Sequence, residues 1–527
     1  MKRTRPKRTR GYDTATARVR ETLTTPAAAV KPAGASAPLK TTALARSSGV
    51  VFLGTIVGRA MNFAAQVLLS NTLGLAAFGA FTLGQSLLSF LSSLSQAGLH
   101  QATMRYLAMG RANQQPAVIR GVMRFAAPRV VLASLALGCA LALLREPIAA
   151  WFFRKPEIAP VLLWVGLVLP FLCVMNWLCF ALRGFRAIKA EAVLKDVVHP
   201  ALFILLCAGT LALSTLSLRA TWWAFLFSTA LAMLYGAVRT YRLMQATPRA
   251  RPDHNVSGDM RRFALPIWFN RLFVAIMSQS DRLLIGVFST VAQVGMYHAA
   301  YRLAMFQTMA MTSFVPMFST AIAEAFARDD RQTIVHYYRM VVRWSLLVTL
   351  PVCLTCVLFA RELLLLFGRE FEAAVPVLML VTAASFVDAA VGPAGQILQI
   401  IGRERAGLVL VMIAAGLAVG VNMILIPQWG AFGAALGTAL GIITLNLGRL
   451  IVLRRFLGVF PYSRLTLKLL LIGVAAAALA GLASPLGNVI KAAVLFAALA
   501  GGKMMWGLER EDREMFRKLK QRILKHS

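Results

Sequence analysis

The sequence predicts an all-α polytopic membrane protein with about fourteen transmembrane helices, on the evidence of its composition, its apolar runs and its charge distribution. Of 527 residues, 58% are hydrophobic and 15% are charged, and the mean hydropathy is +0.68. Soluble domains carry roughly 25% charged residues. A chain this apolar would expose too much hydrocarbon to water, so lipid is the expected solvent.

Fourteen apolar runs are each long enough to cross a bilayer, which takes roughly 20 residues. Prolines interrupt several of them, and such breaks are tolerated in lipid where neighbouring helices satisfy the freed backbone groups. The predicted spans are 48–70, 78–99, 121–144, 158–180, 197–217, 221–243, 263–288, 295–322, 342–360, 373–400, 406–426, 431–453, 466–484 and 487–506.

The positive charges indicate which loops face the cytoplasm. The formal charge is +35, and eleven of the 56 Lys and Arg lie in the first 47 residues. With that end inside, the external loops hold only Arg145, Arg154, Lys155, Arg219, Arg361 and Arg369. This bias predicts that both termini are cytoplasmic. It also explains the high isoelectric point without a nucleic-acid partner, which we do not expect.

A fixed offset of 216 residues relates two halves of the chain. Gly79-Ala-Phe81 aligns with Gly295-Met-Tyr297, Arg145-Glu146 with Arg361-Glu362, and Pro160-Val-Leu162 with Pro376-Val-Leu378. Each repeat contains six predicted spans, so the two copies should share one orientation. Parallel repeats of this kind occur in transporters that bind substrate between two bundles.

These features divide the chain into six predicted parts. Between two terminal tails we expect two lobes of six helices, a linker joining them, and two additional spans after the second lobe. The parts are a disordered basic cytoplasmic tail (1–47), an N-terminal lobe (48–243), a cytoplasmic linker (244–262), a C-terminal lobe (263–455), two further transmembrane helices (456–506) and a basic amphipathic cytoplasmic tail (507–527).

Arginines inside the apolar runs are the main candidates for a binding site, because a charge at mid-bilayer costs at least about 2.5–3.5 kcal/mol. Polar residues follow Arg59 at helical spacing, and Ser278 shares a helical face with Arg271. Such faces predict a hydrated cationic cavity suited to a diphosphate, which arginine grips through forked donors. The predicted cavity residues are Arg59, Asn62, Gln66, Gln85, Arg271, Ser278 and Arg302. The polar stripe that includes Gln85 is equally consistent with packing between helices.

Two acidic residues lie within the predicted spans. Asp281 precedes Arg282 near the outer end of the seventh span, and we interpret the two as a structural ion pair. Asp388 lies near the middle of the tenth span. Two interpretations of it stay open: it carries a coupling proton, or it pairs with an arginine.

No pattern in the sequence points to catalysis, to a cofactor or to a metal centre. A phosphate-binding loop is missing, and we expect no metal-ligand cluster. Cys353 and Cys356 have metal-like spacing but lie in an apolar run without a second pair, which favours packing residues. We therefore predict a protein that is not an enzyme.

Four segments resemble the polysaccharide transporters of the multidrug/oligosaccharidyl-lipid/polysaccharide superfamily, which include O-antigen flippases. They are LSNTLGLAAFGAF, SDRLLIGVFSTVAQVGMYHAAYRLA, ELLLLFGREFEAAVPVLMLV and NMILIPQWGAFGAALGTALG, in the family's order within residues 48–460. The resemblance implies two six-helix lobes, like those of the drug-exporting relatives, that open alternately. It also implies an undecaprenyl-diphosphate-linked sugar as cargo and ion-driven exchange. The long basic N-terminal tail departs from the family pattern.

The resulting prediction is a flippase of lipid-linked oligosaccharides for surface polysaccharide biosynthesis, in a bacterial inner membrane. Its expected partners are that substrate, membrane lipids including anionic ones, and a polysaccharide polymerase with glycosyltransferases. One alternative is a cation-coupled exporter of drugs or metabolites, which usually needs acidic residues in its spans. Another is a membrane polysaccharide polymerase or ligase, which would need a longer external loop.

Overall fold

The computed structural model describes residues 41–213, 215–253, 255–458, 460–462, 464–483 and 487–506. The chain divides into two units, Met1–Leu53 and Gly54–Ser527. Of the first unit, residues 41–53 are described and are helical. The predicted tail 507–527 and most of the predicted tail 1–47 lie outside the described residues.

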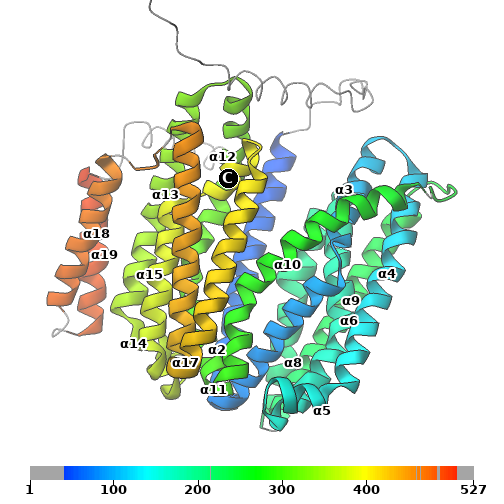
Figure 1. The fold of residues 1–527 in the computed structure, drawn as a ribbon, viewed down its shortest axis with the longest axis horizontal. Coiled ribbons are helices and arrows are strands. Elements are labelled where there is room, and N and C mark those ends of the chain that lie inside the picture. The colour runs from blue at the N-terminus through cyan, green and yellow to red at the C-terminus, as the bar shows by residue number, and fades with distance from the viewer. Residues whose placement is uncertain are drawn as a thin grey trace, which may run out of the picture. The chain divides into compact units, whose positions relative to one another are not determined.

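All regular elements of the described residues are helices (Figure 1). The helices of the first repeat are α2 (Thr41–Ser95), α3 (Leu99–Ala112), α4 (Pro116–Leu143), α5 (Arg145–Pro147), the π-helix η1 (Ile148–Phe152), the 3₁₀ turn η2 (Pro156–Ile158), α6 (Ala159–Gly184), α7 (Ile188–Ala192), the π-helix η3 (Val193–Val198), α8 (His199–Leu213) and α9 (Leu218–Gln245).

The remaining elements form the second repeat and the C-terminal helices. They are α10 (Val256–Phe288), α11 (Val291–Ala304), α12 (Phe306–Ala327), α13 (Arg331–Leu358), α14 (Ala360–Leu365), the 3₁₀ turn η4 (Arg369–Ala374), α15 (Val375–Val391), α16 (Ala394–Ile400), α17 (Glu404–Leu457), α18 (Arg464–Leu482) and α19 (Asn488–Trp506).

The helices confirm the predicted all-α membrane class. Within the described residues, nine helices are long and apolar enough to cross a membrane. Two of them each carry two predicted spans, because α2 bends at Gly74 and α17 bends at Gly430, both with positive φ. At Gly430 an added Cβ would lie 1.5 Å from Oε1 of Gln293, which accepts a hydrogen bond from the backbone N–H of Ala431. Glycine therefore allows both the bend and this contact.

Two predicted spans are less continuous than expected. Span 295–322 is divided between α11 and α12 at Met305, and span 373–400 is divided between α15 and α16. In the second case Gly392 has φ of 71° and Pro393 follows it, so the chain leaves the right-handed helical region and one backbone donor is missing. Both breaks lie close to residues of the candidate sites described below.

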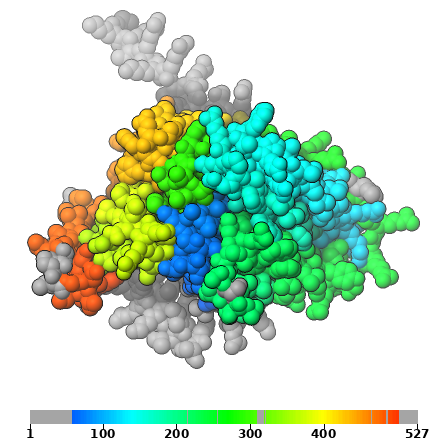
Figure 2. All heavy atoms as spheres, turned by 90° about the horizontal axis from the view of Figure 1, so that it is seen from below, coloured from blue at the N-terminus to red at the C-terminus, as the bar shows by residue number. Residues whose placement is uncertain are grey.

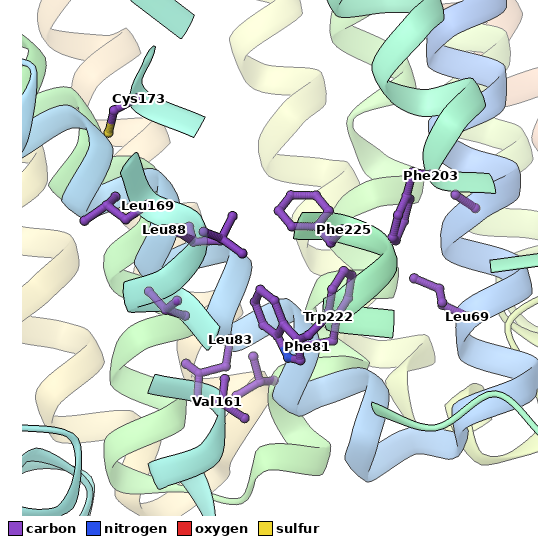
Figure 3. Close-up of a cluster of buried hydrophobic side chains, with 14 of the residues drawn as sticks. Leu69, Phe81, Leu83, Leu88, Val161, Leu169, Cys173, Phe203, Trp222 and Phe225 are labelled. Carbon is purple, nitrogen blue, oxygen red and sulfur yellow. The ribbon is translucent and has the colours of Figure 1, made fainter. Parts of the chain in front are cut away.

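The core of the first repeat is built around aromatic rings (Figure 3). Phe81 of α2 lies 5.0 Å from Trp222 and 5.9 Å from Phe225, both of α9, in edge-to-face arrangements, and the ring of Phe203 in α8 stacks with it at 6.1 Å. All four side chains are buried. Such pairs contribute roughly 0.5–1.5 kcal/mol each beyond burial of area. They join α2, α8 and α9 into one packed body.

The 216-residue offset reappears as matching contacts. Pro160 and Pro376 both lie in the first turn of a helix, α6 and α15 respectively. The contact of Phe81 with Trp222 is matched by a 3.0 Å hydrogen bond between Tyr297 and Thr438, the residues 216 positions later. The second copy thus keeps the position of the contact but replaces an aromatic pair with a polar one.

Gly79 of α2 and Gly295 of α11, equivalent under the offset, pack directly against each other. A Cβ on Gly79 would lie 2.0 Å from the carbonyl oxygen of Val291, and one on Gly295 would lie 3.2 Å from the Gly79 backbone. A side chain at Gly79 has no room, and one at Gly295 would need its neighbours to shift by a few tenths of an ångström. The two repeats therefore meet backbone to backbone at this point.

α10 connects the two repeats along its length. Near its start it packs on α3 and α4, and towards its end it packs on α11 and α17 (Figure 1). The segment before it is held to α4, because the N–H of Asp253 donates to the carbonyl of Ala117 at 3.0 Å. This helix and α2 place polar residues of both repeats beside one another.

Candidate functional site

A cavity of about 380 Å³ lies between α2, α11 and the start of α12. Arg59 and Asn62 reach it from α2, and Arg302 reaches it from the last turn of α11. Its remaining walls are Phe63, Met305, Phe306 and Thr308. The sequence-predicted residues Arg59, Asn62 and Arg302 are thus brought together, although more than 200 positions separate the first from the last.

The break between α11 and α12 shapes this cavity. Arg302 lies just before it and Met305 occupies it, so both side chains reach the hollow at the bend. The rings of Phe63 and Phe306 meet edge to face at 5.2 Å and form an apolar wall. The side chain of Asn62 donates to the carbonyl of Gly58 at 2.8 Å, which fixes the direction of its amide oxygen.

The cavity is cationic. Among the described residues, its lining holds two arginines and no acidic residue. Arg302 experiences the charges of both Arg59 and Arg282, and these like charges repel one another. A partly enclosed, low-dielectric hollow increases that repulsion. An anion entering the cavity would relieve it, and arginine is suited to a phosphate oxygen pair.

Arg282 and Asp281 form the buried polar cluster behind this cavity. The guanidinium of Arg282 lies 4.3 Å from the ring centre of Tyr301 and donates to Oε1 of Gln279 at 3.0 Å. The carboxylate of Asp281 accepts from the Arg282 backbone N–H at 2.8 Å and from the hydroxyl of Tyr297. The two opposite charges attract, but each side chain is held by its own partners.

The other predicted cavity residues lie elsewhere. Arg271 is exposed on α10 and faces the amide of Gln101 on α3, whose oxygen accepts from its Nε at 2.7 Å when turned towards it. Ser278 donates to the carbonyl of Ala275 within α10. Gln66 is buried, with its side-chain oxygen unpaired. Gln85 is half-buried on α2. None of the four lines the cavity of Arg59 and Arg302.

Asp388 of α15 contacts α17. Its Oδ1 accepts from the amide of Asn446 at 2.9 Å and lies 3.9 Å from Nη1 of Arg449. Both partners are one turn apart on α17, and the Arg449 guanidinium lies against Gly395 beyond the break at Gly392. The acid therefore does face an arginine, but one that the sequence reasoning had not singled out.

The two repeats close on each other at the end that the charge bias places outside. Lys155, before η2, donates to the carbonyls of Gly286 and Ser289 at the end of α10. In the other direction, Oε2 of Glu370 in η4 accepts from the N–H of Leu75 at 3.0 Å, just after the α2 bend. The amide of Asn71 donates to the carbonyl of Leu366 at 2.7 Å. Viewed from this end, Figure 2 shows the atoms of the bent α2 segment enclosed by neighbouring segments.

Several residues of these sites gave no signal in the sequence. Phe63, Met305, Phe306 and Thr308 are ordinary members of apolar spans, and only their neighbourhood to Arg59 and Arg302 marks them. Arg449 was recognisable in principle, because it is an arginine in the twelfth span three residues after Asn446. Lys155 and Glu370 lie in loops where charged residues are common.

Comparison with known proteins identifies a family that this chain matches. The model of the family described as polysaccharide biosynthesis protein matches residues 68–376, which is more than half of the chain. A curated relative, a probable low-salt glycan biosynthesis flippase named Agl15 from Haloferax volcanii, is 27% identical over 172 residues. That match covers 31% of this chain and about a third (35%) of the relative's length.

Two solved structures share the fold. The lipid II flippase MurJ in an inward closed conformation matches with a TM-score of 0.69 and 13% identity, over 86% of this chain and 97% of its own. An inward-facing multidrug resistance transporter of the MATE family matches with a TM-score of 0.61 and 17% identity, over 76% and 95%. At these identities the likeness concerns the fold alone.

Proposed function

This chain belongs to the polysaccharide biosynthesis protein family, and we propose that within it the protein is a flippase that moves a lipid-linked oligosaccharide across the membrane. The observation that carries the proposal is the cationic cavity between the repeats, with Arg59 and Arg302 on its walls and no acid among the lining residues that the structure describes. Flippase relatives in sequence and fold support it.

The cargo we propose is a diphosphate-linked glycan on an undecaprenyl chain. Two guanidinium groups supply forked donors for the diphosphate, and Asn62 and Thr308 supply polar contacts for adjoining oxygens. A bound diphosphate would bring two negative charges and several acceptor oxygens to these guanidinium groups. The glycan would follow the diphosphate, and the lipid tail would stay in the bilayer.

Transport requires the cavity to face each side in turn. The contacts of Lys155 and Glu370 close the outer end, so the described conformation would load from the cytoplasm. Release would require those contacts to separate while the repeats rock about their shared interface. The cargo can shift the equilibrium between the two conformations only by the difference between its binding free energies for them.

Asp388 stays our candidate for coupling transport to an ion. Its carboxylate is shared between Asn446 and Arg449, at a helix break, and its side chain is 35% exposed. Protonation would release Arg449 and alter the contact of α15 with α17. Export by an Asp388→Asn variant at the wild-type rate and with the wild-type pH dependence would remove this role.

The test of the proposed function is a double substitution in the cavity. A host lacking the gene should be complemented by the wild-type chain, and surface polysaccharide should be measured together with the amount of protein in the membrane. Arg59→Ala and Arg302→Ala should each lower export by about tenfold, since a hydrogen bond to a charged group contributes roughly 1.5–3 kcal/mol. The double variant should resemble the deletion.

Two further variants make the test specific. Arg328→Ala, an exposed arginine at the end of α12, should leave export unchanged. Arg271→Ala tests the sequence-based prediction that this residue also binds the cargo. Lower export by this variant would support that prediction, and unchanged export would contradict it. Normal export by the Arg59→Ala/Arg302→Ala protein would refute the mechanism. Drug resistance conferred by the wild-type chain, with surface glycan unchanged on deletion, would favour the exporter alternative instead.

A further inference from the structure

A second, separate cavity of about 240 Å³ lies between α4 and the start of α10. Three arginines line it, Arg124 and Arg129 from α4 and Arg261 from α10. The two helices come from different repeats, and the pocket shares no lining residue with the cavity of Arg59 and Arg302. The charge bias places this end of α4 on the cytoplasmic side.

One aromatic ring arranges two of these cations. The guanidinium of Arg129 lies 3.9 Å from the ring centre of Phe125, and that of Arg261 lies 5.4 Å from it. Arg129 also donates to the carbonyl of Phe125 at 2.8 Å. Phe125 is itself buried, so the ring is a fixed support. The guanidinium groups are therefore held around the hollow rather than dispersed.

The positive charge of the pocket is poorly compensated. In the described part of the chain, no acidic side chain lies within ion-pair distance of Arg124, Arg129 or Arg261. One acid, Asp253, lines the pocket, and its Oδ1 accepts from the backbone N–H of Asn255 at 2.9 Å. Three cations thus face one carboxylate that is already engaged.

Hydrogen bonds hold the wall of the pocket in place without a ligand. Arg120 of α4 donates to the carbonyls of Thr247 and Pro248 at 3.0 and 3.2 Å. The N–H of Asp253 donates to the carbonyl of Ala117. The segment leading to α10 is therefore attached to the first turns of α4, next to the pocket. A preformed site loses less entropy when a ligand binds.

The surroundings identify the kind of anion. Farther along α4, Val131, Leu132 and Leu135 are exposed apolar side chains, between 41% and 64% accessible. In a membrane-spanning helix such residues face lipid, and Leu132 lies only three positions after Arg129. A molecule with its anionic group in the pocket would have hydrocarbon-facing protein directly beside it. A free phosphate would make no use of that surface.

We propose that this pocket binds the phosphate group of an anionic membrane lipid whose acyl chains lie along α4. The forked donors of guanidinium groups match phosphate oxygens, whereas a neutral or zwitterionic headgroup would leave part of the charge uncompensated. The bound lipid would join the start of α10 to α4, and so the two repeats, at the cytoplasmic surface. The assignment does not depend on which cargo occupies the other cavity.

The experiment is native mass spectrometry of the full-length protein in detergent, titrated with phosphatidylglycerol. The wild type should retain one phosphatidylglycerol more strongly than any later one, and phosphatidylethanolamine should bind about tenfold more weakly. Arg124→Ala/Arg129→Ala should lower the first phosphatidylglycerol affinity by about tenfold. Arg239→Ala/Arg242→Ala, two exposed arginines at the end of α9, removes the same charge elsewhere and should bind as the wild type does.

Two additional measurements keep the result interpretable. Arg124→Lys/Arg129→Lys keeps the charge but loses the forked donors, so an intermediate affinity is expected if the fold is intact. Inorganic phosphate at millimolar concentration should not displace the lipid, and displacement would identify a free-phosphate site instead. Equal phosphatidylglycerol affinity of the wild type and the Arg124→Ala/Arg129→Ala variant would overturn the proposal.

Discussion

Asp388 shows what a single intramembrane charge requires. Its carboxylate has two partners on α17, the amide of Asn446 and the guanidinium of Arg449. Removing one member of such a pair leaves the other in a poorly solvated position, which destabilises a protein more than removing both. The pair is partly exposed, at 21% and 35%, so solvent weakens the effect.

We predict that Asp388→Asn lowers the apparent melting temperature of the purified protein by a few degrees, an effect of about 1 kcal/mol. Adding Arg449→Gln should restore at least half of the loss, because no unpaired cation is left. Thermal unfolding followed by intrinsic fluorescence measures both. Arg449→Gln could lower the stability of the Asp388→Asn protein by as much as it lowers that of the wild type. That result would show that the two side chains do not interact.

At the scale of elements, the loops that close the outer end act reciprocally. The loop before α6 supplies a cation to the carbonyls that end α10, and the turn before α15 supplies a carboxylate to an N–H that follows the α2 bend. Each charge has the sign that the helix end prefers, since carbonyl ends are negative and N–H ends are positive. Each repeat thus stabilises a helix end of the other.

We predict that Lys155→Met/Glu370→Gln shifts the protein towards the conformation open to the outside. Met305, on the cavity wall, should become accessible from that side. With Met305→Cys in a variant lacking the six native cysteines, labelling of whole cells by a membrane-impermeant maleimide should accelerate several-fold. Arg154→Met/Glu157→Gln, in the same loop, should not change the rate. Unaltered labelling of the Lys155→Met/Glu370→Gln protein would mean that other contacts keep the outer end closed.

The sequence predicted these elements unevenly, for a physical reason. Span positions follow from local hydropathy, so each predicted span overlaps a described helix, although Gly74 and Gly430 join spans into one element and breaks divide the spans 295–322 and 373–400. Contacts between distant segments leave no local signal. Lys155 and Gly286 are 131 positions apart, and Asn71 and Leu366 are 295 apart. For the same reason the sequence places Arg271 in one cavity with Arg59 and Arg302, whereas in the folded chain Arg302 lines the cavity with Arg59 and Arg271 does not.

For the whole molecule, the distribution of Lys and Arg predicts the orientation in the membrane. The positions of the helices by themselves do not predict it. Alkaline phosphatase is active only outside the cytoplasm. Fused after residue 217, within a poorly charged external loop, it should be active, and fused after residue 250, within the linker, it should be inactive. A green fluorescent protein at the C-terminus should fluoresce. The opposite pattern at both phosphatase positions would show that the orientation in the membrane is reversed and that the Lys155 contacts lie on the cytoplasmic side.

The meeting of Gly79 with Gly295 has a consequence for how such a chain arose and how it can change. Where two copies of one sequence face each other through an isologous contact, a residue near the symmetry axis touches its own counterpart. If the two halves arose from one sequence that paired with itself in this way, a substitution at this position would have placed two side chains at the crossing at once. So close a crossing favours glycine in both copies.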